Sequence, residues 1–327
     1  MTDQQVRKRV TAADIARSLG ISRATVGFVL NETQGQTISP TTRERVLAEA
    51  ARLGYRPHLA ARALASGQTK IVLLVLPDWP MDYALRAHLD EASLALDEAG
   101  YSLVTMTPHS GGRARPLWET LQPDIVMGMI PFTADEAARI RASGTRVISP
   151  DQAPAGTGDD LEFQLGPELQ IEHLASRGHR QIAFAATGDP RLAYLAAERL
   201  HLARATADRL GLDFRWGDVD EDNARHVVDE WVASGVSAVA AYNDDVAALV
   251  VSTALRAGLE VPAQLAVIGH DDTPLAKRLV PSLSSIHVDA AGLGRYFAAL
   301  ALNAVEGTPA PAASPVTRAT LVTRESS

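Results

Sequence analysis

The sequence predicts a small all-α head joined to a larger α/β body of two subdomains with doubly wound parallel sheets. Residues 12–53 hold three short segments in which apolar residues recur at helical spacing, with short connections between them. From residue 70 onward, short apolar runs alternate with amphipathic segments, as in parallel sheets covered by helices on both faces. The charge changes at the same place. Residues 1–67 have ten basic and five acidic residues, a net charge of +5, and the remainder has −13.

Composition excludes several kinds of protein. The chain has no cysteine, and therefore no disulfide, thiolate metal site or cysteine nucleophile. The N-terminal segment MTDQQVRKRV lacks the apolar region of a signal peptide, and no run approaches the roughly 18 apolar residues of a membrane span. We therefore expect a cytoplasmic protein without a membrane partner, metal or cofactor. A basic head on an acidic body favours a head that binds phosphate, although a solvated basic surface would give the same charge.

The first two helices of the head are expected on either side of a Gly-Ile-Ser corner. A capping box at Thr11 begins the first helix, and Gly20 ends it. Ser22 can cap the second helix, whose buried face is expected to hold Val26 and Val29. The opposite side of the second helix carries Arg23, Ala24, Gly27 and Phe28.

A third helix completes the head, and a hinge segment follows it. The third helix is expected over residues 40–53, because Ser39 can cap it, Pro40 suits its first position and Gly54 follows it. In the hinge, Pro57 can begin a short helix and Gly67 can follow its end. A helix of this length is marginal alone in water.

The head resembles a known DNA-binding unit. Its first two helices resemble a helix-turn-helix, in which the second helix enters the major groove. More narrowly, VTAADIARSLGISRATVGFVLN and ISPTTRERVLAEAARLGYRPHLAARALASGQT resemble the head of the LacI/GalR family of bacterial transcription regulators. The resemblance assigns contacts to single residues: bases are read by Arg23, Ala24 and Phe28, phosphates are bound by Ser22, Thr25 and Asn31, and the minor groove is entered by Leu64 and Ala61. It also implies that the hinge helix orders on DNA beside its twin in a homodimer.

Two of these assignments have structural alternatives. Many family members have arginine at the position of Phe28. Arginine binds guanine bidentately, whereas phenylalanine offers only apolar contact, for instance to a thymine methyl. The alternative for Phe28 is a place in the core of the small helical bundle. The alternative for Leu64 is an ordinary apolar residue of a linker.

The sequence of the body predicts enough strands and helices to form two parallel sheets. The expected strands cover residues 71–76, 102–106, 124–129, 145–149, 181–186, 238–242 and 265–269. The expected helices cover residues 83–99, 134–143, 167–177, 191–210, 222–234, 244–257 and 290–306. Ligands of such sheets bind beyond the carboxyl ends of the strands, so the cleft between the subdomains is the expected site.

The family resemblance continues through the body. It is carried by LGPELQIEHLASRGHRQIAFAA, by AERL at residues 197–200, by AAYNDDVAALVVSTALRAGLEVPAQLAVIGHDDTPLAKRLVPSLSSI and by LVTRESS. It implies a periplasmic-binding-protein-like body behind a helix-turn-helix head and a hinge helix. The expected boundaries are residues 1–56 for the head, 57–69 for the hinge and linker, and 70–327 for the body, with one subdomain near 70–160 plus 289–318 and the other near 161–288.

The resemblance also assigns an effector site. Arg199, Asn243 and Asp271 match positions that face the effector in family members, and Trp79, Asp82, Tyr83 and Phe132 can line the first subdomain's side of the cleft. Asp271 and Asp272 can instead cap a helix before Pro274, and Arg199 can instead lie on a helix surface. The chain departs from the family at residues 162–164 and at Val219, where an aromatic residue is common. These departures weaken the transfer of any particular ligand.

The sequence therefore favours a repressor without enzyme activity. A homodimer is expected to bind a pseudo-palindromic operator in double-stranded DNA and to respond to a small, sugar-like effector. No dinucleotide fingerprint, P-loop, nucleophile elbow or zinc-protease pair is present to suggest an enzyme. Two alternatives remain: a regulator whose degenerate cleft senses no ligand, and an architectural DNA binder.

Overall fold

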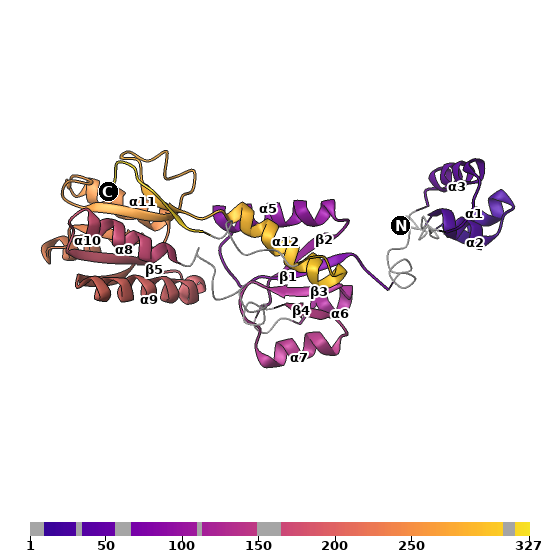
Figure 1. Cartoon of the computed structure of the whole chain (residues 1–327), viewed down its shortest axis with the longest axis horizontal. Helices are drawn as coiled ribbons and strands as arrows, with labels where there is room; N and C mark the ends of the chain where they lie inside the picture. The colour runs from indigo at the N-terminus through magenta and orange to yellow at the C-terminus, as the bar shows by residue number, and fades with distance from the viewer. Residues whose placement is uncertain (1–9, 31–34, 56–66, 110–112, 149–164, 310–317) are drawn as a thin grey trace, which may run out of the picture. The chain divides into compact units, whose positions relative to one another are not determined.

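The computed structural model describes residues 10–30, 35–55, 67–109, 113–148, 165–309 and 318–327 (Figure 1). Packing divides the chain into two units, residues 1–70 and residues 71–327, which are described separately. Asn31, Ala61 and Leu64 lie outside the described residues, as do residues 162–164. In the described part of the chain, no helix is both long enough and apolar enough to cross a membrane.

The first unit is the expected three-helix bundle. It consists of α1 (Ala12–Leu19), α2 (Arg23–Leu30) and α3 (Pro40–Leu53). The Asp14 carboxylate accepts hydrogen bonds from the backbone N–H and the hydroxyl of Thr11, which fixes the start of α1. Gly20 and Gly54 end α1 and α3 with a φ of +66°, a conformation that favours glycine. The fully buried core residues are Ile15, Val26, Val29 and Val46.

The second unit begins with a four-stranded parallel sheet in the order β2-β1-β3-β4. Its strands are β1 (Ile71–Val75), β2 (Ser102–Met106), β3 (Ile125–Gly128) and β4 (Arg146–Ile148). Its helices are α5 (Tyr83–Glu98), α6 (Leu117–Leu121), α7 (Ala134–Ala142) and α12 (Ala290–Glu306). Alternate residues of β1 enter different clusters: Leu74 packs with residues of α5 and α12, and Leu73 packs with residues of α6 and α7. Helices therefore cover both faces, as predicted.

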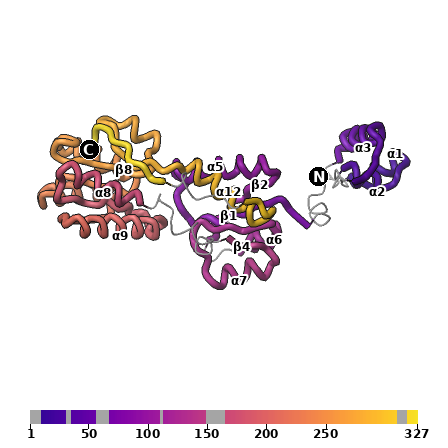
Figure 2. The backbone as a smooth tube through the Cα atoms, viewed as in Figure 1, coloured from indigo at the N-terminus to yellow at the C-terminus, as the bar shows by residue number. Residues whose placement is uncertain are grey.

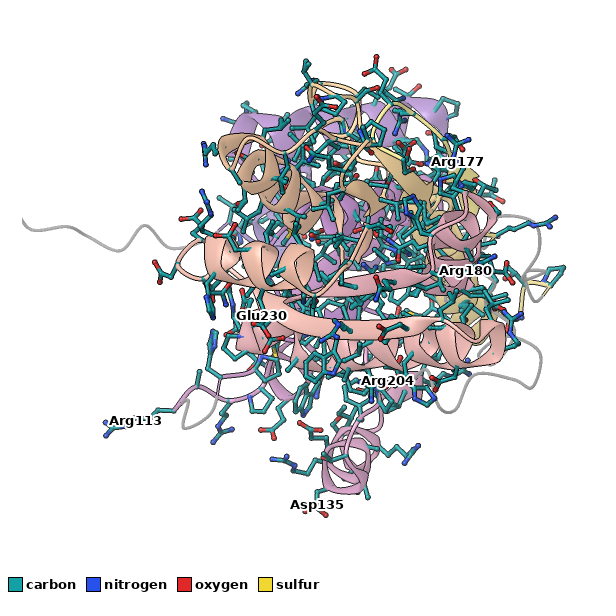
Figure 3. All side chains as sticks on the ribbon, turned by 90° about the vertical axis from the view of Figure 1, so that its left-hand side faces the viewer. Arg113, Asp135, Arg177, Arg180, Arg204 and Glu230 are labelled. Carbon is teal, nitrogen blue, oxygen red and sulfur yellow. The ribbon has the colours of Figure 1, made fainter. Side chains whose placement is uncertain are left out.

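A six-stranded sheet in the order β10-β9-β8-β7-β5-β6 forms the rest of the second unit. Its strands are β5 (Gln181–Thr187), β6 (Asp213–Val219), β7 (Ala238–Ala241), β8 (Ala266–Asp271), β9 (Ser284–His287) and β10 (Thr320–Val322), all parallel except the β9–β10 pair. The helical segments are α8 (Gly166–Ser176), the 3₁₀ turn η3 (Pro190–Leu192), α9 (Ala193–Leu210), α10 (Ala224–Ala233) and α11 (Asp244–Arg256). Figure 3 shows the exposed side chains of Arg177, Arg180, Arg204 and Glu230 projecting from this part of the molecule.

Four elements of the body were not expected from the sequence, namely α6, β6, β9 and β10. The edge strand β6, with sequence DFRWGDV, is largely exposed and therefore lacks an apolar run. In β9, the buried residues Ser284 and Ser285 are polar and hydrogen-bonded, which hides the strand from a search for apolar runs. The C-terminal segment, yellow in Figure 2, returns to this sheet. It pairs through β10, and the backbone carbonyl of Ser326 accepts a hydrogen bond from the N–H of Val267.

Candidate functional site

The first candidate site is the exposed side of α2. The Ser22 hydroxyl accepts a hydrogen bond from the backbone N–H of Thr25 at 3.0 Å and lies 2.8 Å from its hydroxyl, so it caps the helix. Arg23 and Ala24 are exposed, and Phe28 is half-buried without joining the apolar cluster that fills the bundle. Positions 24 and 28 lie one turn apart on the same side of the helix. The structure thus separates these side chains from the core.

A hydrogen-bonded group of side chains joins α1 to α3. The hydroxyl of Ser18 on α1 donates a hydrogen bond to Glu49 on α3, and Arg52 donates two more to the same carboxylate. The hydrogen bonds from Arg52 and then Ser18 lower the pKa of Glu49 to about 2. Among the described residues, Arg23 makes no ion pair, so its guanidinium is available for an external anion or base edge.

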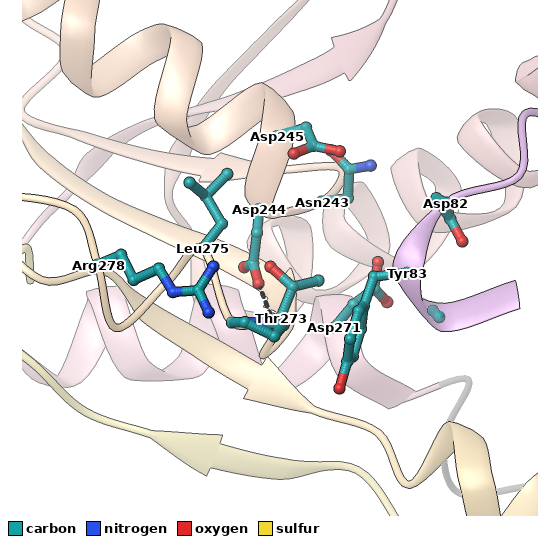
Figure 4. A pocket seen from close by; sticks show the side chains of 11 residues that line it. Asp82, Tyr83, Asn243, Asp244, Asp245, Asp271, Thr273, Leu275 and Arg278 are labelled. Carbon is teal, nitrogen blue, oxygen red and sulfur yellow. Dashed lines mark hydrogen bonds between the residues drawn. The ribbon is translucent and has the colours of Figure 1, made fainter. Parts of the chain in front are cut away.

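The second candidate site is a pocket of about 520 Å³ in the second unit (Figure 4). Residues at the start of α5, at the start of α11 and after β8 meet there, at the carboxyl ends of the strands. The structure brings four predicted residues together in its lining: Asp82, Tyr83, Asn243 and Asp271. The other lining residues are Ala84, Asp244, Asp245, Thr273, Pro274, Leu275 and Arg278.

Two lining residues also begin the helices that carry them. Asp82 accepts a hydrogen bond from the backbone N–H of Leu85 at 2.8 Å, and Asn243 accepts one from that of Val246 at 2.9 Å. Each uses one side-chain oxygen as a cap. Among the described residues, the second oxygen of Asp82 and the amide nitrogen of Asn243 have no hydrogen-bond partner, so both can serve a ligand.

Arg199 is not part of the pocket lining but contacts Asp271, which is. Its guanidinium donates to the carbonyl oxygen of Tyr242 and to Oδ1 of Asp271, the latter at 3.2 Å. It also lies 4.6 Å from the centroid of the Tyr242 ring. Only 22% of the Arg199 side chain is exposed, which argues against the alternative of a surface helix residue.

Asp271 and Asp272 have an unusual backbone conformation, with φ values of +92° and +46°. The Arg324 guanidinium donates a hydrogen bond to the Asp272 carboxylate at 2.5 Å. The backbone N–H of Asp272 donates another to the Ser285 hydroxyl at 3.0 Å. Residues 273–279 form turns rather than a helix, so neither aspartate caps a helix there. Residues kept in such conformations concentrate at functional sites.

The pocket is predominantly acidic, with four carboxylates and one guanidinium in its lining. Burial, followed by the charge of Asp271, raises the pKa values of Asp82 and Asp245 above the ordinary range. Burial acts to raise the pKa of Asp271 as well, but the nearby Arg199 and His270 more than offset it, so the pKa of Asp271 falls below its usual range. Of the aspartates in the lining, Asp271 is therefore the one whose ionised form the surroundings favour.

Two predicted residues lie elsewhere. Trp79 packs against the cluster beneath α5 and α12, and Phe132 packs against the cluster on the other face of the first sheet. The sequence search missed Asp244, Asp245, Thr273 and Arg278. The first two adjoin Asn243 in the run NDD, which was the available signal. In the described part of the chain, no group of three acidic or histidine side chains is arranged to hold a metal ion.

Asp244 is expected to make the stability of the body depend on pH. It is 0% exposed and accepts hydrogen bonds from the Ser285 hydroxyl and the Thr273 N–H, both at 2.6 Å. Burial raises its pKa to about 6, so the folded state binds this proton more tightly than the unfolded state. The stabilisation from protonation is complete below about pH 4 and is lost as the pH rises through about 6.

Asp244→Asn is therefore expected to be more stable than the unsubstituted protein at pH 7 by about 2 kcal/mol and to differ little at pH 4. The asparagine can donate to Ser285 while its oxygen accepts from Thr273. Urea unfolding of both proteins at the two pH values measures this. If the free energy of unfolding changes equally with pH in both proteins, the raised pKa does not belong to Asp244.

Comparison with known proteins gives two matches to family models. Residues 5–58 match the model for bacterial regulatory proteins of the lacI family, and residues 171–327 match the periplasmic binding protein-like domain. The chain is 30% identical to the HTH-type transcriptional regulator MalR of Streptomyces coelicolor, over 96% of this chain and 95% of that protein. It is 29% identical to the lactose operon repressor of Escherichia coli, over 88% of this chain and 82% of that protein.

Solved structures show the same fold. The Lac repressor dimer bound to operator and the anti-inducer ONPF aligns with a TM-score of 0.77 at 24% identity, over 98% of this chain and 99% of that chain. The complex of the transcriptional regulator CelR with cellobiose aligns with a TM-score of 0.63 at 25% identity, over 98% and 100%. These matches confirm the predicted combination of a helix-turn-helix head and a periplasmic-binding-protein-like body.

Proposed function

Because the chain belongs to the LacI family of bacterial transcriptional regulators, we propose that it represses transcription by binding an operator and that a small molecule in its cleft controls this binding. The observation that carries the proposal is the exposed side of α2, where Arg23, Ala24 and Phe28 stand apart from the bundle core. A side chain outside the core can reach base edges in the major groove without unfolding the head. We also propose that the protein has no enzyme activity.

Within the head, Arg23 and Ala24 would read bases together with Phe28, which suits an apolar contact such as a thymine methyl. The hydroxyls of Ser22 and Thr25 lie at the helix start, where phosphate contacts are favoured. Asn31 is proposed as a further phosphate contact, and Leu64 and Ala61 as minor-groove contacts of the hinge.

We also propose that the protein acts as a homodimer on a pseudo-palindromic site. A two-fold symmetric pair of heads reads two copies of one half-site, so the symmetry of the operator follows that of the protein. The similar Lac repressor structure is a dimer on its operator. The sedimentation coefficient at micromolar concentration tests this proposal directly.

The effector is proposed to be sugar-like. Carboxylate and amide groups that line the pocket, such as those of Asp82, Asn243 and Asp271, suit the hydroxyl groups of a polyol. The similar CelR structure is a complex with cellobiose. Trp79 and Phe132 lie outside this pocket, so a role for them in binding would require a different arrangement of the cleft.

Selection from random duplex DNA with the full-length protein tests the central proposal. Enrichment of a pseudo-palindromic sequence supports the proposal. If no sequence is enriched, either by the protein alone or with added sugars, the proposal is wrong. The selected duplex then serves in a release assay with cellobiose, maltose, lactose and galactose. Release or tightening by one of these sugars supports the proposed effector class.

Arg23→Ala is expected to weaken binding to the selected operator by about 5- to 150-fold, the range for one bidentate base contact, and to relax selection at one position of each half-site. Fluorescence anisotropy at fixed salt measures this. Arg17→Ala is the control, because Arg17 is an exposed arginine of α1 that pairs with Asp14. If Arg17→Ala weakens binding, its affinity should fall by the same factor for the operator and for random duplex. An equal loss on both duplexes for Arg23→Ala would remove Arg23 from base reading.

A further inference from the structure

His270 is a buried imidazole that contacts Asp271, a residue of the pocket lining. It is the residue before Asp271 in β8 and is 2% exposed. Its Nδ1 lies 2.6 Å from Oδ1 of Asp271, and its Nε2 is buried without a hydrogen-bond partner among the described residues. The sequence analysis gave His270 no role, and the lining of the pocket does not include it.

The contacts of the ring define its protonation. An ionised carboxylate only accepts hydrogen bonds, so the proton between the two groups must lie on Nδ1 of His270. A second proton on Nε2 would be a buried donor without an acceptor among the described residues, which burial and the nearby Arg199 both disfavour. His270 is therefore expected to be neutral, with its proton on Nδ1.

Gly166 keeps the ring in this position. It is the first residue of α8, and a methyl group on its Cα would lie 2.7 Å from Cδ2 of His270 and would overlap Nε2. The backbone of α8 therefore packs directly on the edge of the imidazole. This close approach leaves the ring little freedom to move away from Asp271.

Two donors converge on one oxygen of Asp271. Oδ1 receives the hydrogen bond from His270 at 2.6 Å and that from Arg199 at 3.2 Å. Among the described residues, Oδ2 receives none, although Asp271 lines the pocket. The φ of +92° at Asp271 is unfavourable for a residue with a side chain, so this orientation needs external support.

We propose that His270 is a positioning residue which, together with Arg199, anchors one oxygen of Asp271 and thereby presents the other oxygen to the ligand. The inference rests on the proposed effector function of the pocket. The presented oxygen only accepts hydrogen bonds, so it selects a hydroxyl or ammonium group of the ligand and disfavours an anionic group. Asp82 and Asp245 in the same lining reinforce this selection.

Nitrogen NMR of the full chain with ¹⁵N-labelled histidine tests the anchor without any ligand. At pH 7, the signals that disappear in His270→Asn are expected to show a neutral ring protonated at Nδ1. A ring protonated at Nε2, or at both nitrogens, would overturn the proposal. This result does not depend on DNA or sugar binding, so it stays decisive if the proposed function fails.

A matched pair of variants tests the presentation of Asp271. Asparagine at position 270 can place an amide N–H near the position of Nδ1, whereas leucine has a similar size and no donor. Both lose the ring packing, so their difference isolates the hydrogen bond. Calorimetry uses whichever of cellobiose, maltose, lactose and galactose binds the unsubstituted protein. His270→Leu is expected to weaken binding at least tenfold and His270→Asn by less than threefold.

Equal losses in the two variants would overturn the positioning role. Gly166→Ala provides a third variant in which His270 itself is unchanged. It is expected to resemble His270→Leu in sugar affinity, because the added methyl displaces the ring. Unchanged affinity in a folded Gly166→Ala protein would also overturn the role. If none of the four sugars binds, the proposed effector class fails, and the NMR result still decides whether His270 anchors Asp271.

Discussion

Gly294→Ala is expected to destabilise the body by about 2 kcal/mol. Gly294 is buried in α12 where this helix crosses α5. A methyl group there would overlap the carbonyl oxygen of His88 and lie 3.0 Å from the backbone nitrogen of Ala92. These neighbours are backbone atoms that cannot rotate away, so the two helices must separate. Alanine favours a helix by roughly 1 kcal/mol over glycine, which offsets only part of this loss.

Tryptophan fluorescence during urea unfolding measures this effect in the body alone, because the chain has four tryptophans, at 79, 118, 216 and 231, and all lie beyond residue 70. Gly27→Ala is the matched control. It makes the same substitution inside a helix, α2, where nothing lies within 4 Å of the added methyl. The control should leave the tryptophan transition unchanged. A Gly294→Ala midpoint equal to that of the unsubstituted protein would contradict the close crossing.

Arg199→Met is expected to destabilise the body by about 2 to 3 kcal/mol. The substitution keeps much of the side-chain volume but leaves Asp271, which is 11% exposed, without its guanidinium partner. It also removes the hydrogen bond to Tyr242 and the contact with its ring. The pKa of Asp271 should rise, because burial then acts with less opposition.

A double-mutant cycle identifies the cause of the loss. If Asp271 is left as an uncompensated buried charge, Arg199→Met combined with Asp271→Asn should be more stable than Arg199→Met alone. Urea unfolding at pH 7 provides the four free energies. Strictly additive losses would show that Arg199 acts through packing on Tyr242 instead of through its charge.

The three described helices of the head could be predicted from the sequence because their signals are local. Thr11, Ser39 and Gly54 mark helix ends through contacts with residues three or four positions away. The sequence also predicted the largely buried, apolar strands of the body, such as β1 and β5. The edge strand β6 and the serine-rich β9 carry no such signal, since their pairing is fixed by distant strands.

Part of the pocket could be predicted from the buried strands that lead to it. Asn243 follows the buried strand β7 and Asp271 ends β8, and the carboxyl ends of parallel strands meet at one edge of the sheet. The orientation of Arg199 was not predictable, because Asp271 lies 72 positions away in the sequence. Nor could the sequence place Trp79 and Phe132, since aromatic side chains near a cleft can equally fill the core beside it.

The order of segments in the two sheets has a consequence for synthesis on the ribosome. The first sheet begins at Ile71, but α12, which covers one of its faces, is completed only at Glu306. Until then the nascent chain exposes apolar side chains such as Val72, Ile125 and Met127. The second sheet likewise waits for β10 at residues 320–322. Neither subdomain can therefore finish folding before nearly the whole chain has been translated, so both should mature together and need protection from aggregation until they do.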